Sequence, residues 1–536
     1  MRRIWIITSL AVALALYALL VASFRSELID DAYISLTYAR HLANGDGLVW
    51  NPGERVEGYT DFLWVLLLSL SGATPSAAEW FGILAGALLL VALTLPIRLI
   101  PNARASLVLL PVLVAAHPAF AFWSAKGLET SLFTLFLTAG LFVCAYAPAV
   151  RWSVFGVHLL VIASLTRPDG LLFLALASAD ALRRHGWRHA GALVALPLAL
   201  LVPHLAFRLA YYGYPLPNTY YVKVGASADQ VLRGLHYVWR YLAHPGAILL
   251  AATLAFPRAL KSPERFLTVA LASGIAAVAA VGGDAFGAHR FIVPLMPTIS
   301  LLAIAGLHRI ADRVAPQSRI ADSAASQSLG QGGTRTNGAR RLGLLNALPL
   351  SLAALLAASM LAGTWRDVRA EETSIASFTK LMAEVGHLLK ARTPEHITIA
   401  LNPAGAVPYY SERKAIDMLG LNDAHIAHSP TVSMGSRKAG HEKGDGAYVL
   451  SRRPEMILIG NVWVDEADTI KMIHPSRRSE VQLVKNPALY ELYEMLFFPL
   501  GDGRSLKALV LREGTSLPES GWGPKRFLPI PKEKWQ

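Results

Sequence analysis

The chain has 536 residues, of which 54% are hydrophobic and only 16% are charged. Soluble domains carry about 25% charged residues, so this composition excludes an ordinary soluble protein and predicts long uncharged segments. The net charge of +13 is typical of a membrane protein with basic cytoplasmic loops, and we expect no nucleic-acid partner. The single cysteine, Cys144, excludes an internal disulfide bond.

Apolar segments dominate the first two thirds of the chain and predict a polytopic α-helical membrane protein with about 11 transmembrane helices. Several of them are shorter than the roughly 20 residues that a span needs. The first is too long for a cleavable signal peptide, so we expect an uncleaved helix with a cytoplasmic N-terminus. The segments are 4–23, 78–99, 105–122, 130–147, 152–165, 169–182, 190–209, 246–257, 266–282, 291–311 and 343–362.

The charges of the loops give an independent topology. With the N-terminus inside, every cytoplasmic loop is rich in Arg or Lys, as the positive-inside rule requires. Residues 314–342 are rich in Gly, Ser and Gln, and we interpret them as a disordered cytoplasmic loop. An odd number of spans then places the end of the chain outside. We therefore expect a transmembrane domain over 1–363 and a soluble extracytoplasmic domain over 364–536.

The predicted outer domain changes in character from the rest of the chain. A polar helical pattern covers 372–393, and short strand-like runs follow at 396–400, 455–460 and 508–511. Strands that alternate with helices predict a small α/β domain.

The first outer loop, 24–77, begins with two adjacent carboxylates, Asp30 and Asp31. Neighbouring carboxylates raise each other's pKa, and one of them can then act as a general base. The alternative is structural, because Asp is a common N-cap and a helix is expected from residue 32 to 42. The residues alone leave both interpretations open.

Aromatic and acidic residues accompany this pair on the outer side. Tyr and Trp beside carboxylates form surfaces on which sugar rings stack and hydrogen-bond. The alternative is an aromatic belt at the membrane interface. The candidate substrate-binding residues are Tyr33, Trp50, Glu57, Tyr59, Glu129, Tyr212, Asn218 and Asp284.

Basic side chains also gather on the outer side, and Arg and Lys are the usual ligands of phosphate. The alternatives are that Arg167 simply pairs with Asp169 and that the Gly-rich run 440–446 is an ordinary turn. No P-loop, dinucleotide fingerprint or zinc spacing occurs. The candidate phosphate-binding residues are Arg167, Lys223, Arg290, His441 and Lys443.

Several of these motifs together resemble those of the membrane arabinofuranosyltransferases of the mycobacterial terminal type, which belong to the GT-C superfamily. The first-loop match is long and specific, and the resemblance covers most of the chain except 314–342 and the last residues. The matching runs are DDAYISLTYARHLANGDGLVWNPGERVEGYTDFLW (30–64), GLET (127–130), TRPDGLL (166–172), YYGYPLPNTYYVK (211–223), GGD, HRF and PL.P within 282–297, NPAGAVPYYS (402–411), IDMLGLNDAHIA (416–427) and GHEKGDGAYVL (440–450).

The resemblance implies a GT-C bundle in the bacterial inner (plasma) membrane, with an extracytoplasmic active site. It implies a polyprenyl-phosphate-linked sugar as donor and a catalytic acid in the first outer loop, at Asp30 or Asp31. Some GT-C enzymes use a divalent cation, here Mg²⁺, Mn²⁺ or Ca²⁺, which carboxylates would hold.

Arabinofuranose is the expected sugar, with a mannosyl, glucosyl or aminoarabinosyl donor as the alternative. The acceptor would be a glycan, lipopolysaccharide, or a pilin or flagellin. A polyprenyl-lipid transporter is a rival function, but it would need polar residues at the bilayer midplane.

Overall fold

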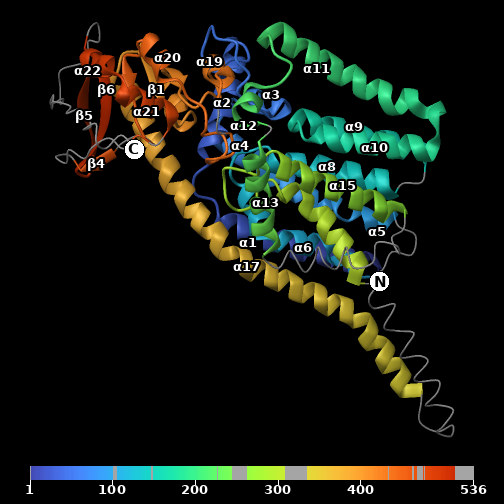
Figure 1. The fold of residues 1–536 in the computed structure, drawn as a ribbon. Helices are drawn as coiled ribbons and strands as arrows, with labels where there is room; N and C mark the ends of the chain where they lie inside the picture. Colours follow the sequence, from blue (N-terminus) through green and yellow to red (C-terminus); the bar gives the residue numbers. More distant parts are fainter. Residues whose placement is uncertain are drawn as a thin grey trace.

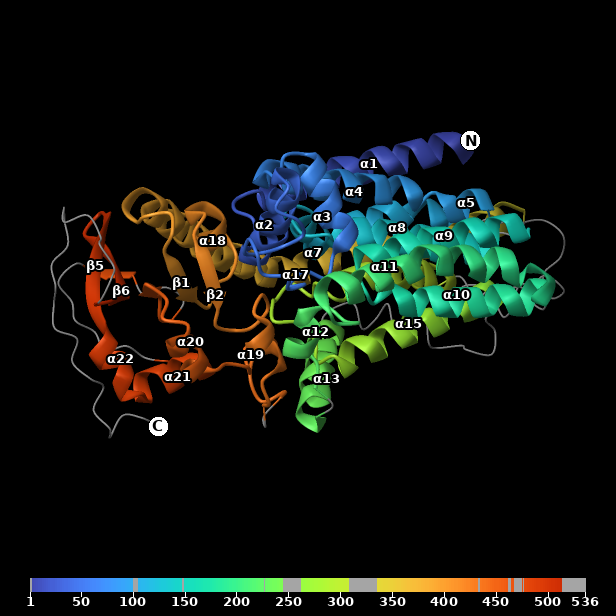
Figure 2. The same ribbon diagram turned by 90° about the horizontal axis from the view of Figure 1, so that it is seen from above.

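The computed structural model describes a helical bundle followed by a smaller part that contains a β-sheet (Figure 1). Figure 2 shows the sheet at one end of the bundle. The described residues are 2–99, 105–146, 149–225, 227–243, 262–307, 335–431, 434–460, 464–466, 475 and 477–512.

The bundle consists of apolar helices, several of which have a proline at their start. Its longer helices are α1 (Arg2–Ser23), α4 (Pro75–Ala92), α8 (Thr130–Tyr146), α9 (Val150–Thr166), α10 (Gly170–His185), α11 (Leu196–Tyr212) and α15 (Ser262–Ala280). Shorter elements complete it: α5 (Leu95–Leu99), η1 (Ala105–Leu109), α6 (Leu110–Ala115), α7 (Pro118–Ser124), η2 (Trp187–His189), η3 (Gly191–Ala195) and η5 (Val293–Leu295). Pro111 and Pro118 each stand at the start of a helix, where a missing N–H costs nothing.

Long apolar helices make the chain a multi-pass membrane protein. Among the described residues, four helices are long and apolar enough to cross a bilayer, or five if the bent pair Leu107–Ala115 and Pro118–Ser124 forms one span. The pair is bent by 63°. Further apolar helices are shorter than a span needs, and the expected segment 246–257 lies outside the described residues. The predicted number of about 11 spans therefore stays a prediction.

Short helices from the first loop and from the segment after α11 lie between the bundle and the sheet. They are α2 (Asp30–Asn44), α3 (Phe62–Leu70), α12 (Asn218–Lys223) and α13 (Ala228–Leu242). Gly45 ends α2 with a φ of 89°, a left-handed conformation that favours glycine at a helix C-terminus.

One helix, α17 (Arg335–Arg392), connects the bundle to the sheet. We expected an apolar span at 343–362 and a separate polar helix at 372–393, but the structure joins them. The linking residues 363–371 contain no proline, and their one glycine, Gly363, lowers helix stability only modestly, so they are compatible with a helix. Residues 314–334 of the predicted disordered loop lie outside the described residues. Residues 335–342 belong to α17, so this part of the loop is helical and not disordered.

The sheet has six strands in the order β2-β1-β3-β6-β4, with β5 also paired to β6. Strand β1 is parallel to β2 and β3, whereas β6 is antiparallel to its neighbours. Asp502 and Gly503, both with positive φ, form the two-residue turn between β5 and β6, as twisted hairpins require. The strands are β1 (Thr398–Leu401), β2 (Lys414–Asp417), β3 (Met456–Ile457), β4 (Val464–Glu466), β5 (Tyr493–Gly501) and β6 (Arg504–Leu511).

Five short helices surround the sheet: α18 (Ala406–Ser411), α19 (Ala424–His428), α20 (Gly446–Ser451), α21 (Arg478–Lys485) and α22 (Pro487–Leu492). The first outer loop closes the free edge of β2. The Asn51 amide donates to the carbonyl of Ala415 at 2.7 Å and accepts from the Ala415 N–H at 3.0 Å. Asn51 thus satisfies a strand edge that would otherwise be unpaired.

A buried ion pair ties the same loop region to α17. The Lys126 ammonium is fully buried and lies 2.6 Å from the Glu372 carboxylate. It also donates to the carbonyls of Phe24 and Glu27, both at 2.9 Å. The ammonium thus has a counter-charge and two hydrogen-bond acceptors, and a buried charge is tolerated only when it is paired and hydrogen-bonded.

Removal of one partner of this pair should therefore destabilise the protein strongly. We expect Lys126→Met to lower the free energy of unfolding by about 3–5 kcal/mol, because it leaves a buried carboxylate without a cation. The double variant Lys126→Met/Glu372→Met should recover most of the loss. Thermal unfolding of the detergent-purified proteins measures both. Equal loss in the single and double variants would contradict the assignment.

Candidate active site

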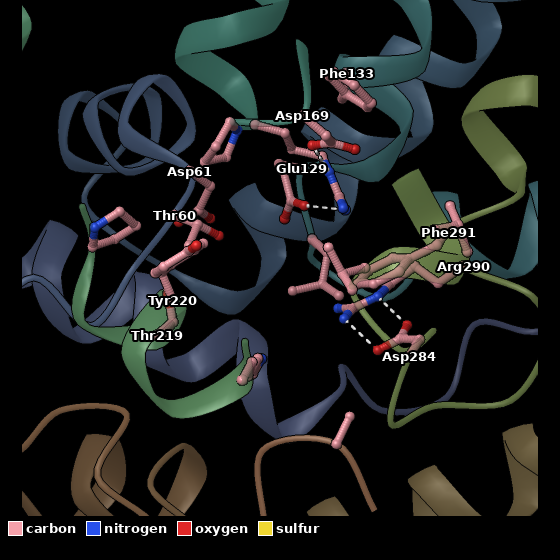
Figure 3. Close-up of a pocket in the computed structure, with 18 of the residues that line it drawn as sticks. Thr60, Asp61, Glu129, Phe133, Asp169, Thr219, Tyr220, Asp284, Arg290 and Phe291 are labelled. Carbon is pink, nitrogen blue, oxygen red and sulfur yellow. Dashed lines mark hydrogen bonds and ion pairs between the residues drawn. The ribbon is translucent and has the colours of Figure 1, made fainter. Parts of the chain in front are cut away.

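A cavity of about 300 Å³ lies between the bundle and the elements that precede the sheet. The first outer loop, the start of α8, the turn at 167–169, α12 and the loop at 283–291 line it (Figure 3). The segments come from distant parts of the chain, and each follows or precedes an apolar helix. The ionisable residues in its wall are Asp31, Asp61, Glu129, Arg167, Asp169, Lys223, Asp284 and Arg290.

Arg290 and Asp284 form a two-point ion pair in this wall. The Arg290 Nε lies 2.6 Å from one carboxylate oxygen and Nη2 lies 2.8 Å from the other. The connecting loop turns sharply, with positive φ at Gly283, Ala288 and His289. A side chain at Gly283 would collide with Tyr237, so glycine is required there. The turn brings Asp284 and Arg290 together.

Arg167 forms the second charged wall. Its guanidinium donates to Glu129 at 3.0 Å and to Asp169 at 3.0 Å. It also lies 5.0 Å from the ring centre of Phe291, and Arg290 lies 5.2 Å from the same ring. The pairing of Arg167 with Asp169, weighed above as a structural alternative, is present, and Glu129 is a second partner.

Asp61 was not among the predicted site residues, but the structure places it in the cavity wall beside Glu129 (Figure 3). It precedes α3, a position typical of an N-cap, yet its side chain makes no capping hydrogen bond. It accepts instead from the Ser35 hydroxyl at 2.8 Å. Burial, together with the nearby charge of Glu129, raises the pKa of Asp61. In the sequence, only the position of Asp61 within residues 24–77 could have indicated that it belongs to the site.

The two adjacent carboxylates of the first loop have different environments. Asp30 is buried and accepts the N–H groups of Gly405 at 3.2 Å and Ala406 at 2.8 Å, at the start of α18. Asp31 lines the cavity and has no hydrogen-bonding or ionic partner among the described residues. Neither is the N-cap of α2, which is Ile29, so the capping interpretation is wrong.

Lys223 is the cation of the cavity wall that remains unpaired among the described residues. It ends α12, and its aliphatic chain runs along Gly440, where a Cβ would lie 3.2 Å from the Lys223 Cε. The other two cations, Arg167 and Arg290, already hold carboxylates. An anion that enters the cavity therefore meets one ammonium with all of its donors available.

Of the other predicted residues, only Tyr59 lines the cavity, and the rest have contacts elsewhere. Tyr59 hydrogen-bonds Tyr212, and Tyr33 hydrogen-bonds Tyr410. Trp50 is buried, and Glu57 pairs with Arg208 at 2.7 Å. These four residues, Trp50, Glu57, Tyr33 and Tyr212, are not in the wall.

Three further predicted residues contact backbone carbonyls and also lie outside the cavity wall. The Asn218 amide donates to the carbonyls of Gly420 and Leu421, at 2.7 and 3.0 Å. The Lys443 ammonium donates to two carbonyls, each at 2.7 Å, and is therefore engaged in folding. A ring nitrogen of His441 lies 3.0 Å from the Ala439 carbonyl, and burial lowers the pKa of His441 to about 4.

The wall is rich in carboxylates, but it does not provide a clear cation site. Within the described residues, no group of three or more His, Cys, Asp or Glu side chains could hold a metal ion. Glu129 and Asp284 are each directed to an arginine. The donor set does not fit a protein-held divalent cation, and we assign no step to one.

Comparisons with known proteins show which sequences and folds this chain resembles. Residues 366–505 match a family model described only as a domain of unknown function, DUF8728. The chain is 30% identical over 259 residues to the terminal β-(1→2)-arabinofuranosyltransferase of Mycobacterium tuberculosis, a match that covers 44% of this chain and 41% of that protein.

The crystal structure of ArnT from Cupriavidus metallidurans bound to undecaprenyl phosphate aligns with 94% of this chain and 98% of ArnT, at a TM-score of 0.58 and 16% identity. The apo form aligns over 94% and 97%, at a TM-score of 0.54 and 16% identity. The chain has the GT-C fold. The resemblance to a membrane arabinofuranosyltransferase is thereby confirmed, at the partial coverage given above.

The site has a pH-dependent contact at Asp30. Burial raises the pKa of Asp30 to about 7, from an ordinary value of 3.8. The folded protein thus holds the proton more tightly than the unfolded chain. The contribution of Asp30 to stability is complete below about pH 4 and is lost as the pH rises to about 7.

We therefore expect wild type to lose stability relative to Asp30→Asn as the pH rises from about 4 to 8. Asn keeps one acceptor for the amides of α18 and cannot ionise. Melting temperatures of the two purified proteins across this pH range measure the difference. If the melting temperature of the wild type instead rose relative to that of the variant with increasing pH, the prediction would be wrong. The N–H groups of Gly405 and Ala406 would then favour the charged form of Asp30.

Proposed function

We propose that the protein transfers a sugar, arabinofuranose, from a polyprenyl-phosphate donor to an acceptor outside the cytoplasm. The observation that carries the proposal is a pair of groups in one cavity, the Asp31 carboxylate and the Lys223 ammonium, neither of which has a partner among the described residues. A carboxylate and a cation are the two groups that transfer from a sugar phosphate needs, a base for the incoming hydroxyl and a partner for the leaving phosphate.

Asp31 would act as the general base. An acceptor hydroxyl has a pKa far above 7, so it must lose its proton as its oxygen attacks the anomeric carbon. Asp31 would take that proton while the bond from the anomeric carbon to the phosphate oxygen breaks and its electron pair leaves with the phosphate. Asp30 cannot take this role in the same geometry, because its oxygens are held by α18.

Lys223 would hold the phosphate of the donor, with Arg290 as a second ligand. The leaving polyprenyl phosphate gains negative charge, which an ammonium and a guanidinium stabilise. Arg290 can share its remaining N–H donors with a phosphate while it keeps Asp284. The likeness to the structure of ArnT bound to undecaprenyl phosphate supports a polyprenyl phosphate at this site.

Asp61 and Glu129 would bind hydroxyl groups of the donor sugar. Burial raises the pKa of Asp61, and a neutral carboxyl group can donate one hydrogen bond and accept another. The similarity to the arabinofuranosyltransferase favours arabinose as that sugar. A mannosyl, glucosyl or aminoarabinosyl donor is the alternative sugar. A lipid transporter is a less favoured function, because the charged residues gather in one cavity.

The proposal includes an orientation. The protein would lie in the bacterial inner membrane with a cytoplasmic N-terminus, and the cavity and the C-terminal α/β domain would lie outside. The basic loops support this orientation. The acceptor would be a glycan, lipopolysaccharide, or a pilin or flagellin.

A donor panel tests the function. The purified protein in nanodiscs is incubated with polyprenyl-phosphate-linked arabinose, mannose, glucose or aminoarabinose, each labelled in the sugar, and with membrane extracts as acceptor. We expect transfer from the arabinosyl lipid. Transfer from another lipid alone would replace the sugar, and movement of intact labelled lipid across vesicles without transfer would indicate a transporter.

The proposed base makes a sharper prediction with the active donor. Asp31→Asn should reduce the rate by about 10²–10⁴-fold, because it keeps the shape and removes the base. Asp46→Asn, an exposed residue of the same loop outside the cavity wall, is the matched control and should keep the wild-type rate. A wild-type rate in well-folded Asp31→Asn would remove Asp31 from catalysis and direct attention to Glu129.

A further inference from the structure

A second, open groove lies on the outer surface near the cavity. The segment before α12 forms one side, and α19 with the start of α20 forms the other, as the proximity of α12 and α19 in Figure 2 indicates. None of its residues belongs to the active site described above. The lining residues are Tyr214, Ala424, His425, His428, Ser429, Pro430 and Asp445.

Stacked rings form the floor of this groove. The ring of the exposed His428 lies 4.3 Å from that of Tyr214, at an interplanar angle of 22°, and 4.2 Å from that of Tyr221. His425 stacks on Tyr448 at 4.0 Å and 14°. Tyr214 is 41% exposed, which is unusual for a large aromatic side chain held in a stack. The stacking leaves part of Tyr214, His425 and His428 exposed to solvent.

The rings continue to the catalytic cavity without a break. Tyr220 lines the cavity and is 43% exposed, and its ring meets Tyr221 edge-on at 5.7 Å. Tyr221 in turn contacts His428. Leu216 also lines the cavity and stands two residues after Tyr214. An extended ligand could therefore lie on Tyr214 and His428 while its end reaches the cavity.

The polar groups of the groove are hydrogen-bonding and not cationic. Asp445 contacts the His425 Nε2 at 3.0 Å, and its side chain is 31% exposed. Burial and the charge of Lys443 lower the pKa of His428, so its ring is neutral at pH 7. No Lys or Arg belongs to the described lining, and the nearby Lys443 ammonium is directed to two backbone carbonyls. Arg478 lies at the edge, where it donates to the Pro430 carbonyl at 3.2 Å, so the described groove has a cation beside its lining but none within it.

We propose that this groove binds the non-reacting residues of a neutral oligosaccharide acceptor, whose terminal residue enters the cavity past Tyr220. The proposal rests on the proposed sugar transfer. Sugar rings stack on aromatic faces, and their hydroxyls suit Asp445 and Ser429. Among the three acceptor classes, this chemistry favours a neutral glycan over phosphorylated lipopolysaccharide or a protein.

A binding measurement without donor tests the groove independently of turnover. The full-length protein in nanodiscs is titrated with a long linear arabino-oligosaccharide, and the bound fraction of the oligosaccharide is measured by NMR. We expect saturable binding that Tyr214→Ala weakens about tenfold. Trp187→Ala, which removes an 82% exposed aromatic residue outside the groove, should leave the affinity unchanged. His428→Phe keeps a stacking ring and should bind better than His428→Ala.

Acceptor kinetics with the active donor give the second readout. Tyr214→Ala and His428→Ala should raise KM for the long acceptor about tenfold and leave KM for a disaccharide acceptor and for the donor unchanged. A uniform fall in kcat with every acceptor would overturn the proposal, as would the absence of oligosaccharide binding. Binding only of a phosphorylated core oligosaccharide or of a pilin would also overturn it. If no sugar is transferred but oligosaccharide binding still depends on Tyr214 and His428, the proposed function is refuted and the groove proposal stands.

Discussion

The contact between the Asp30 carboxylate and the N–H groups of Gly405 and Ala406 determines how the two parts of the molecule meet. It fixes the first turn of α2 against α18, and a side chain at Gly405 would collide with the backbone of Asp30. Because Asp31 is the next residue on α2, this contact also sets the direction of the proposed base. Asn51 and Asn218 fasten the same interface at two further points.

Charge balance in the cavity follows from this arrangement. Each arginine of the wall already holds at least one carboxylate, so both remain charged and ordered without a ligand. Lys223 has no such partner among the described residues, and it supplies the uncompensated positive charge where a phosphate would lie. Preorganised charges cost no reorganisation during the reaction, which is how such sites stabilise a leaving group. In our account, α12 and the loop at 283–291 therefore serve the phosphate, and α2 serves the acceptor.

The sequence predicted the membrane class, the gathering of polar residues and seven members of the cavity wall: Asp31, Tyr59, Glu129, Arg167, Lys223, Asp284 and Arg290. It could not separate Asp30 from Asp31, because their difference depends on α18, almost four hundred residues later. Lys443 looked like a phosphate ligand, but two carbonyls use its ammonium. Asp61 was missed because its place in the cavity wall and its contact with Ser35 depend on how the loop folds back on α2. These features depend on long-range contacts that local patterns do not encode.

The most direct test of the account is a cryo-EM structure of the Asp31→Asn protein in nanodiscs with its polyprenyl-phosphate-sugar donor. Our account predicts the phosphate within hydrogen-bond distance of the Lys223 ammonium and the Arg290 guanidinium. It also predicts that the face of the anomeric carbon opposite the phosphate is open to residue 31. A donor phosphate held by His441 or Lys443 instead, or an anomeric carbon remote from residue 31, would contradict it.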